Sequence, residues 1–232
     1  MLPGTAQEVG TAEGARASDQ PVRHVVRALE FDILFGRLRP RERLVEDALM
    51  RRFGVKRHVI RRALDELERI GVVVRARNRG AAVRDFTAQE VEEVYELREL
   101  LQRHAAERMP LPGDPDHVAA LKEIQGRHDA AVAAGDLRAV DQVNDVFHRV
   151  FFSVCGNRQL ADAIAHYMQL TRAMRVYPMA DPVSLAKLRD EHWEMIRALE
   201  EGDRAALVRL VVQHLQPSKA AYLAMRRLID RT

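Results

Sequence analysis

The stretch that decides the fold spans residues 43–83 and reads RLVEDALMRRFGVKRHVIRRALDELERIGVVVRARNRGAAV. Apolar residues recur in its first two thirds at the three- and four-residue spacing of an amphipathic helix. A glycine ends each segment with this pattern, because glycine readily takes the left-handed conformation that closes a helix. We therefore expect two short helices joined by a tight turn, 46–53 and 56–70.

The last third of this stretch has the character of a β-hairpin. The segments 72–75 and 81–84 are β-prone, and an asparagine and a glycine lie between them. A further helix with one apolar face is expected over 22–35, before the stretch. Helix, helix and hairpin in this order predict a winged helix-turn-helix over residues 21–86.

The first 20 residues are small and polar, and no apolar core interrupts them. They lack the apolar segment of a signal peptide or anchor, and we expect a disordered tail over 1–20. Elsewhere no apolar run approaches the roughly 20 residues that cross a bilayer. The single cysteine, Cys155, excludes an intramolecular disulfide and fits a reducing compartment. These features predict a cytoplasmic protein with no membrane partner.

Charge is distributed unevenly along the chain. Residues 21–84 carry 17 lysines and arginines against 8 aspartates and glutamates, whereas residues 85–232 carry 19 against 23. A basic head joined to a mildly acidic body favours a head that binds a polyanion. Charge alone leaves a second interpretation open, in which the head has only a solvated basic face.

The start of the segment 56–70 carries residues suited to DNA. In a helix-turn-helix the first turns of the second helix enter the major groove. Arg57 and Arg61 lie four residues apart, hence on one face, and arginine can donate two hydrogen bonds to guanine O6 and N7. The hairpin tip is suited to phosphate or minor-groove contact. The predicted DNA contacts are Lys56, Arg57, His58, Arg61, Arg62, Arg77, Arg79 and Gly80. Alternatively, the arginines are solvated or pair with carboxylates of the same helix, Asp65, Glu66 and Glu68.

This head resembles that of the GntR family of transcriptional regulators. The residues that carry the resemblance are Arg43-Leu44, Leu49, Phe53-Gly54-Val55-Lys56-Arg57, Ile60-Arg61-Arg62-Ala63-Leu64, Leu67-Glu68, Gly71, Arg79-Gly80-Ala81 and Val83. The resemblance implies that Arg57 and Arg61 contact bases and that the wing glycine lies near the DNA. Three positions depart from the family pattern. Arg41 stands where glycine is usual, Val59 where proline is frequent, and Lys56 where a serine or threonine caps the helix at a gain of about 1 kcal/mol.

Helix follows helix after residue 86, and no convincing strand interrupts them. Thr87 and Glu90 form the capping-box pattern that starts the first helix, and aspartates open several later ones. The expected helices are 87–109, 114–135, 136–156, 157–176, 181–202 and 203–229. We therefore predict a mainly α protein, in which residues 87–232 form an all-helical bundle that binds its ligand between facing helices.

Histidine placement predicts a metal site in this bundle. Asn144 and His148 lie four residues apart, on one face of a helix. His192 and His214 lie at nearly equal distances, roughly 15–17 Å, on either side of the turn at Gly202, so antiparallel packing would bring them level. Three imidazoles and one amide oxygen can bind a divalent metal such as Zn²⁺. The alternative is that these are hydrogen-bonded core residues without a ligand.

Residues 87–229 resemble the FCD effector domain of the FadR subfamily, in the shorter six-helix form of the VanR branch. The residues that carry this resemblance are Arg98, Phe147-His148, Gly156-Asn157, Glu191-His192, Gly202-Asp203 and His214-Leu215. Metal-binding members hold the ion with Asp or Asn and three histidines, which implies Asn144, His148, His192 and His214 as ligands here. Aspartate is usual at the first position, so the neutral Asn144 should hold the metal more weakly. The resemblance also implies that Arg98 faces the effector, in a pocket where Gln102 replaces a frequent glutamate.

Together these features predict a homodimeric, ligand-responsive regulator, with repression as the expected mode, that binds a palindromic double-stranded operator. The expected effector is a small organic acid whose carboxylate pairs with Arg98 beside a divalent metal, zinc first, with nickel and manganese as alternatives. Two other functions stay open: a metal-dependent hydrolase that uses the histidines, and a DNA-binding protein whose helical domain only dimerises. The sequence has no general base placed beside the histidines, no HExxH and no phosphate loop, so we do not expect an enzyme.

Overall fold

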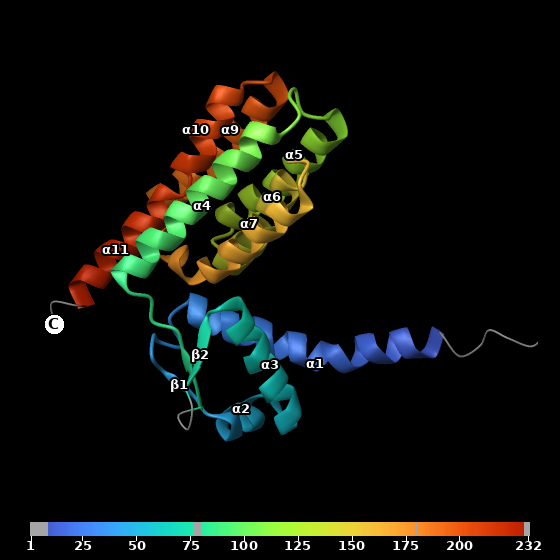
Figure 1. Cartoon of the computed structure of the whole chain (residues 1–232), viewed down its shortest axis with the longest axis vertical. Helices are drawn as coiled ribbons and strands as arrows, with labels where there is room; N and C mark the ends of the chain where they lie inside the picture. Colours follow the sequence, from blue (N-terminus) through green and yellow to red (C-terminus); the bar gives the residue numbers. More distant parts are fainter. Residues whose placement is uncertain (1–8, 77–79, 180, 230–232) are drawn as a thin grey trace, which may run out of the picture. The chain divides into compact units, whose positions relative to one another are not determined.

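The computed structural model describes residues 9–76, 80–179 and 181–229. The chain divides into two compact units, Met1–Asp85 and Phe86–Thr232, which we call the head and the body (Figure 1). Among the described helices, none is long and apolar enough to cross a membrane.

The head consists of three helices and a small antiparallel sheet. Its elements are α1 (Val9–Leu34), β1 (Arg43–Leu44), α2 (Glu46–Phe53), α3 (Arg57–Ile70), β2 (Val73–Ala76) and β3 (Gly80–Val83). The strands lie in the order β1-β3-β2, and Val73 pairs with Val83. A shared apolar core joins the helices to the sheet through Leu29, Ile60 and Leu67. The predicted helix-turn-helix and hairpin are confirmed, whereas β1 was missed because two residues are too short to show alternation.

The first helix differs from the prediction at its N-terminal end. The sequence predicted a disordered tail to Gln20, but α1 already begins at Val9; residues 1–8 lie outside the described part. The segment 12–17 is rich in alanine, glutamate and arginine, which have high helix propensity. Such residues extend a helix that the buried face of Val22, Val25 and Leu29 has already nucleated.

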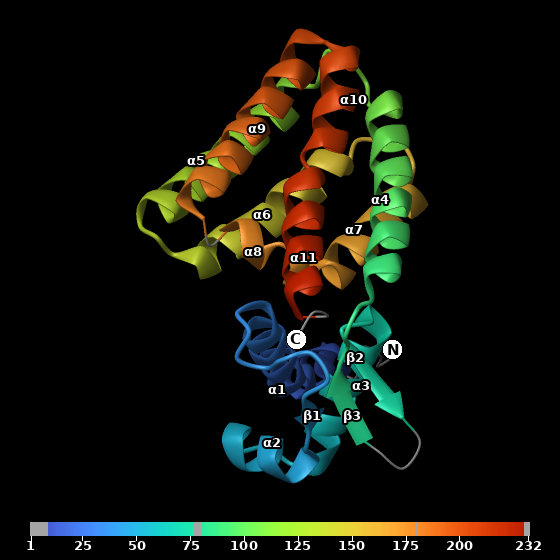
Figure 2. The same ribbon diagram turned by 90° about the vertical axis from the view of Figure 1, so that its left-hand side faces the viewer.

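The body is all-helical over its described residues. Its elements are α4 (Ala88–Arg108), α5 (Pro115–Ala133), α6 (Leu137–Phe152), α7 (Arg158–Leu170), η1 (Arg172–Met174), α8 (Val176–Met179), α9 (Pro182–Glu201), α10 (Arg204–Gln213) and α11 (Gln216–Ile229). Helix α4 packs against α10 and α11, and α5 packs against α6 and α9 (Figure 2). Phe147, Phe151 and Leu199 are fully buried in the core between them. The capping box predicted at Thr87 and Glu90 is present.

Two of the six predicted body helices are interrupted. The helix expected over 203–229 is divided into α10 and α11, because Pro217 cannot donate a backbone hydrogen bond and its ring crowds the carbonyl of Gln213. The helix expected over 157–176 ends at Leu170, where the Thr171 hydroxyl donates to the Tyr167 carbonyl oxygen at 2.8 Å. The first interruption places His214 at the C-terminal cap of α10, and the second produces η1.

Candidate DNA interface and metal centre

Helix α3 begins at Arg57, after Lys56 in extended conformation. The Lys56 side chain makes no capping hydrogen bond, as its substitution for serine or threonine predicts. Arg57 and Arg61 keep 50% and 58% of their side-chain surface exposed. The start of α3 therefore presents two arginines of one helix face to solvent.

The partners of these arginines differ from the alternative that the sequence left open. Arg57 and Arg61 both contact Glu46 of α2, and Arg57 Nη2 also donates to Asp47 Oδ1 at 2.6 Å. The carboxylates of α3 have other partners: Asp65 and Glu68 pair with Arg75, and Glu66 pairs with Arg69. Carboxylates of α2, rather than those of α3 itself, therefore hold Arg57 and Arg61.

The remaining predicted DNA contacts are placed as follows. Lys56 and His58 are exposed, and Arg62 Nη2 pairs with Asp19 Oδ1 of α1 at 2.6 Å. Gly80 opens β3 with φ +73°, a conformation that glycine adopts without strain. Arg77 and Arg79 lie outside the described residues.

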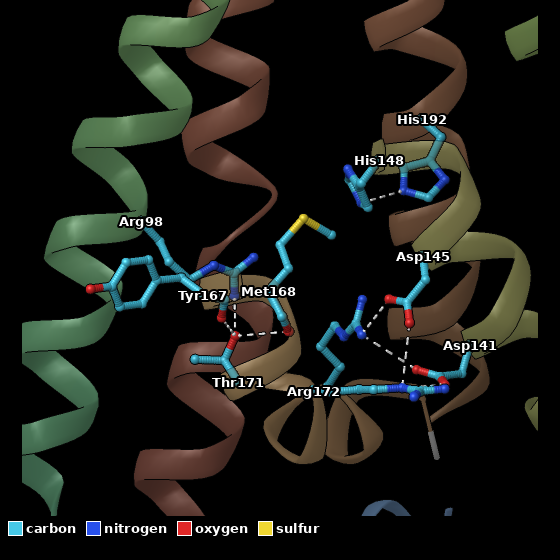
Figure 3. A network of polar contacts seen from close by, with 10 residues as sticks. Arg98, Asp141, Asp145, His148, Tyr167, Met168, Thr171, Arg172 and His192 are labelled. Atoms are coloured by element: carbon cyan, nitrogen blue, oxygen red, sulfur yellow. Dashed lines mark hydrogen bonds and ion pairs between the residues drawn. The ribbon is translucent and has the colours of Figure 1, made fainter. Parts of the chain in front are cut away.

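Three histidines from three helices converge in the body: His148 of α6, His192 of α9 and His214 at the end of α10. The Nε2 atom of His192 lies 3.3 Å from Nε2 of His148 and 3.2 Å from Nε2 of His214. Figure 3 shows His148 and His192 as neighbours in contact, with their rings nearly perpendicular. The expectation that antiparallel packing brings His192 level with His214 is confirmed.

Two of these rings form a hydrogen bond through Nδ1 to an acceptor oxygen. His192 Nδ1 lies 2.9 Å from Gln125 Oε1, and His214 Nδ1 lies 2.7 Å from Glu191 Oε2. Gln125 Nε2 donates to Asp129, which orients its oxygen toward His192. Because these oxygens only accept, both Nδ1 atoms carry a proton, and both Nε2 atoms face the other histidines.

Converging imidazole nitrogens are a donor set that divalent metals take in proteins. A zinc–nitrogen bond of about 2.0–2.1 Å with tetrahedral angles separates neighbouring nitrogens by about 3.3 Å. The two Nε2–Nε2 distances of 3.3 and 3.2 Å match that spacing. The ligand atoms of all three imidazoles lie within 4.8 Å of one another, so they can hold a divalent ion that favours nitrogen ligands, such as zinc or nickel.

Burial keeps His148 and His192 neutral. Desolvation lowers the pKa of His148 and His192 well below 6.5, and the nearby His214 lowers both further. Desolvation also lowers the pKa of His128, whose ring lies 5.2 Å from that of His192, to about 4. A neutral imidazole has a free lone pair, so His148 and His192 can bind a metal at neutral pH without first losing a proton.

A cavity of about 40 Å³ adjoins the histidines, several times the space that one water needs. Asn144, one helical turn before His148, and Gln102 line it together with Arg98 and Arg175. Arg98 is buried and donates from Nη1 to Thr171 Oγ1 at 2.8 Å (Figure 3). Burial lowers the pKa of Arg98 to about 10, so its guanidinium remains charged at neutral pH. The cavity thus combines a possible metal site with a buried cation.

The chain matches two known protein families, one in each unit. Residues 93–217 match the FCD domain, and residues 21–83 match the bacterial regulatory proteins of the gntR family. The FCD match alone covers more than half of the chain. This chain belongs to the GntR family. It is of the FadR type, because its effector domain is an FCD domain.

Individual relatives of this GntR-family chain are regulators. The HTH-type transcriptional regulator YdhC of Bacillus subtilis is 25% identical over 183 residues, which cover 78% of this chain and 82% of YdhC. The HTH-type transcriptional repressor RspR of Escherichia coli is 24% identical over 208 residues, which cover 89% of this chain and 91% of RspR.

Solved structures share the fold. A GntR transcriptional regulator from Rhodococcus sp. RHA1 superposes with a TM-score of 0.70 at 23% identity, over 88% of this chain and 97% of the other. E. coli McbR/YncC superposes with a TM-score of 0.70 at 20% identity, over 90% and 99%.

The family settles the class of function. GntR proteins are DNA-binding transcriptional regulators that commonly dimerise, so this chain is a transcriptional regulator and not the metal-dependent hydrolase that the sequence also left open. The resemblance to the GntR and FCD families is confirmed.

The sequence missed several buried residues in and around the GntR protein's pocket. Gln125 and His128 lie three residues apart on α5, and both are buried; polar residues at apolar positions of a helix were the available signal. Two further buried groups are Asp141 of α6 and Arg175, which follows η1. Asp141 accepts from Arg172 Nε at 2.8 Å, and Arg175 pairs with Asp145 at 2.6 Å. No sequence pattern indicates these two pairings, because the partners lie about 30 positions apart.

Proposed function

We propose that this regulator is a homodimeric repressor that binds a palindromic duplex operator and responds to a small organic acid. In this proposal residues 21–86 bind DNA, and residues 87–232 bind the effector and dimerise. The convergence of three Nε2 atoms beside a cavity that also contains Arg98 is the observation that carries the effector site. The name of RspR, a repressor, favours repression over activation.

On the DNA side, Arg57 and Arg61 are proposed to read bases in the major groove. Their shared face and their exposure support this role. Lys56, His58 and Arg62 flank them and would contact phosphates or neighbouring bases, and the hairpin with Arg77, Arg79 and Gly80 would follow the adjacent groove.

On the effector side, His148, His192, His214 and Asn144 would hold a divalent metal, zinc by preference. When bound, the metal supplies a Lewis-acidic centre for an oxygen of the effector. Gln125 and Glu191 orient two of the histidine rings. Arg98 has a hydroxyl partner but no carboxylate partner among the described residues, so an effector carboxylate would complete its charge pairing.

The effector can change DNA binding only if it binds one arrangement of the protein more tightly than the other. The site is suited to this task, because its groups come from α4, α6, α9 and the junction of α10 with α11. A ligand that draws these groups together would favour the arrangement in which they are close.

Metal analysis tests the effector half of the proposal. The purified full chain should bind about one zinc per chain, measured by calorimetry after chelation and by elemental analysis. His148→Ala, His192→Ala and His214→Ala should each abolish this binding, and Asn144→Asp should strengthen it, because a carboxylate adds the charge that the amide lacks. His166→Ala is the matched control, since His166 is exposed on α7. A wild type that takes up neither zinc, nickel nor manganese contradicts the metal site.

DNA selection tests the other half. The full chain should enrich a two-fold symmetric site from a random duplex library, and sedimentation should show a dimer. Arg57→Ala or Arg61→Ala should each lose about 1–3 kcal/mol of affinity for that site and relax the base preference at one position. Arg69→Ala, at the far end of α3, is the control. Full affinity and specificity in both variants would contradict the proposed reading of bases.

A further inference from the structure

One carboxylate connects the two arginines at the start of α3. Glu46 is the first residue of α2, and its Oε2 atom lies 3.4 Å from Arg57 Nη1. Its two oxygens lie 3.2 and 3.1 Å from Arg61 Nε. The neighbouring Asp47 contacts Arg57 alone. Glu46 is 29% exposed and Asp47 59%, so Glu46 is the better shielded of the two.

This arrangement restrains side chains that would otherwise move freely. An arginine has four rotatable bonds, and fixing it upon binding costs conformational entropy. Helical spacing puts Arg57 and Arg61 on one face but does not set the direction of their guanidinium groups. A carboxylate in contact with both sets that direction before DNA arrives, while half of each side chain remains exposed.

The same carboxylate opposes contacts that carry no sequence information. Phosphates attract arginine at every DNA sequence, and this attraction supplies most non-specific affinity. A negative charge beside the arginines weakens that attraction uniformly. The directional hydrogen bonds to guanine then supply the remaining favourable energy. The negative charge is thus a repulsive element of the kind that specificity requires.

We propose that Glu46 is a specificity-determining positioning residue, which aligns Arg57 and Arg61 for base recognition and disfavours their binding to phosphate alone. The inference rests on the proposed reading of bases by these two arginines. It assigns a function to a residue of α2 that does not itself need to touch DNA.

A purely structural role for Glu46 would have a different signature. Glu46 and Asp47 both lie in the first turn of α2, where a negative charge stabilises the helix dipole. Asp47→Asn therefore controls for the dipole, and Glu66→Gln, toward the other end of α3, controls for the loss of one negative charge from the head. Glu46→Gln keeps the size of the side chain and removes only its charge.

The experiment uses the full chain and two probes: the duplex that the wild type enriches from a random library, and a scrambled duplex of the same composition. Affinity for each is measured by fluorescence anisotropy at several salt concentrations. Glu46→Gln should lower the ratio of the two affinities roughly fivefold to tenfold, as expected when one or two long side chains lose their ordering. Affinity for the scrambled duplex should hold or rise, with a salt dependence steeper by up to about one ion. Asp47→Asn should change the ratio less, and Glu66→Gln should leave it unchanged.

Two results would overturn the inference. One is an unchanged affinity ratio in Glu46→Gln. The other is an equal fall of both affinities together with a lower thermal stability, which is the structural signature. The failure of the proposed function is a separate result: if Arg57→Ala and Arg61→Ala both retain the wild-type ratio, the arginines do not read bases. If Arg57→Ala and Arg61→Ala lower the affinity ratio and Glu46→Gln does not, only the role proposed for Glu46 is wrong.

Discussion

On α3 of the head, arginines pair with carboxylates at the surface, whereas around Asp141 in the body they do so inside the protein. Arg57, Arg61 and Arg62 all keep about half of their side-chain surface in solvent, although each has a carboxylate partner. Asp141 is 1% exposed, and its partners Arg172 and Arg175 are 15% and 11% exposed. The chemistry of the pairs is the same, but the surrounding dielectric differs.

This difference shows what each set of charges is available for. An exposed pair gains little from its attraction, so its arginine can leave the partner for DNA at small cost. A buried pair has lost its hydration, and removing one partner leaves a charge with no compensation. Arg98 is also buried, with the Thr171 hydroxyl as its hydrogen-bond acceptor. The effector carboxylate proposed above would add a charged partner there, whereas the exposed arginines of α3 can exchange theirs at small cost.

The sharpest test of this comparison is the removal of a buried carboxylate. Asp141→Ala should lower the free energy of unfolding of the body by about 3 kcal/mol, because Arg172 loses its nearer carboxylate partner and Arg172 and Arg175 are left to share Asp145. Urea denaturation followed by the fluorescence of Trp193, the single tryptophan, reports on the body. Glu200→Ala breaks the exposed pair with Lys122 in the same unit and should cost at most about 1 kcal/mol. Equal losses in the two variants would contradict the role assigned to burial.

The next largest effect is expected from acid, which should lower the stability of the body more than that of the head. Burial holds the pKa of His128 at about 4, and those of His148 and His192 well below 6.5. Below pH 6.5 the unfolded chain therefore binds protons that the folded body does not, so the body loses stability as pH falls toward the folded pKa. His128 alone should account for about 2 kcal/mol between pH 7 and pH 5.

The measurement is the urea midpoint of metal-free protein, followed by Trp193 fluorescence at each pH. The head offers the contrast, since its His24 and His58 are exposed. Hydrogen exchange of α3 should change less than that of α6 over the same pH range. A body whose stability is flat from pH 7 to pH 5 would mean that these histidines are hydrated.

The smallest effect is expected from an exposed pair of the head. Arg62→Ala breaks the contact with Asp19 and should change the stability of the head by less than about 1 kcal/mol, measured by hydrogen exchange of the α3 amides. It should nevertheless weaken DNA binding at all sequences, if Arg62 contacts a phosphate as proposed. A loss of stability of 3 kcal/mol would show that a head pair behaves like the buried pairs of the body.

The backbone conformation of Arg41 shows why glycine is usual at this position of the family pattern. Arg41 stands where glycine is usual, and the structure gives it φ +68°, in the left-handed region. A side chain there costs about 1–2 kcal/mol, which is why the position favours glycine. The side chain of Arg41 pairs with Asp85 at 2.6 Å. The sequence identified the unusual residue, but only the structure showed which conformation it must adopt.

Local rules account for what the amino-acid sequence determined by itself. Helix periods, the Thr87–Glu90 capping box and the hairpin turn depend on residues within about four positions of one another. The amino-acid sequence alone is therefore enough to predict them. The level placement of His192 and His214 also followed, because the rise per residue is constant on both sides of one turn. Tertiary structure alone decided the pairings across larger distances: Glu46 with Arg61, Gln125 with His192, and Arg98 with Thr171, which are 15, 67 and 73 positions apart. Such pairs depend on how helices pack, and many combinations of charged and polar residues would satisfy the same sequence pattern until packing selects one.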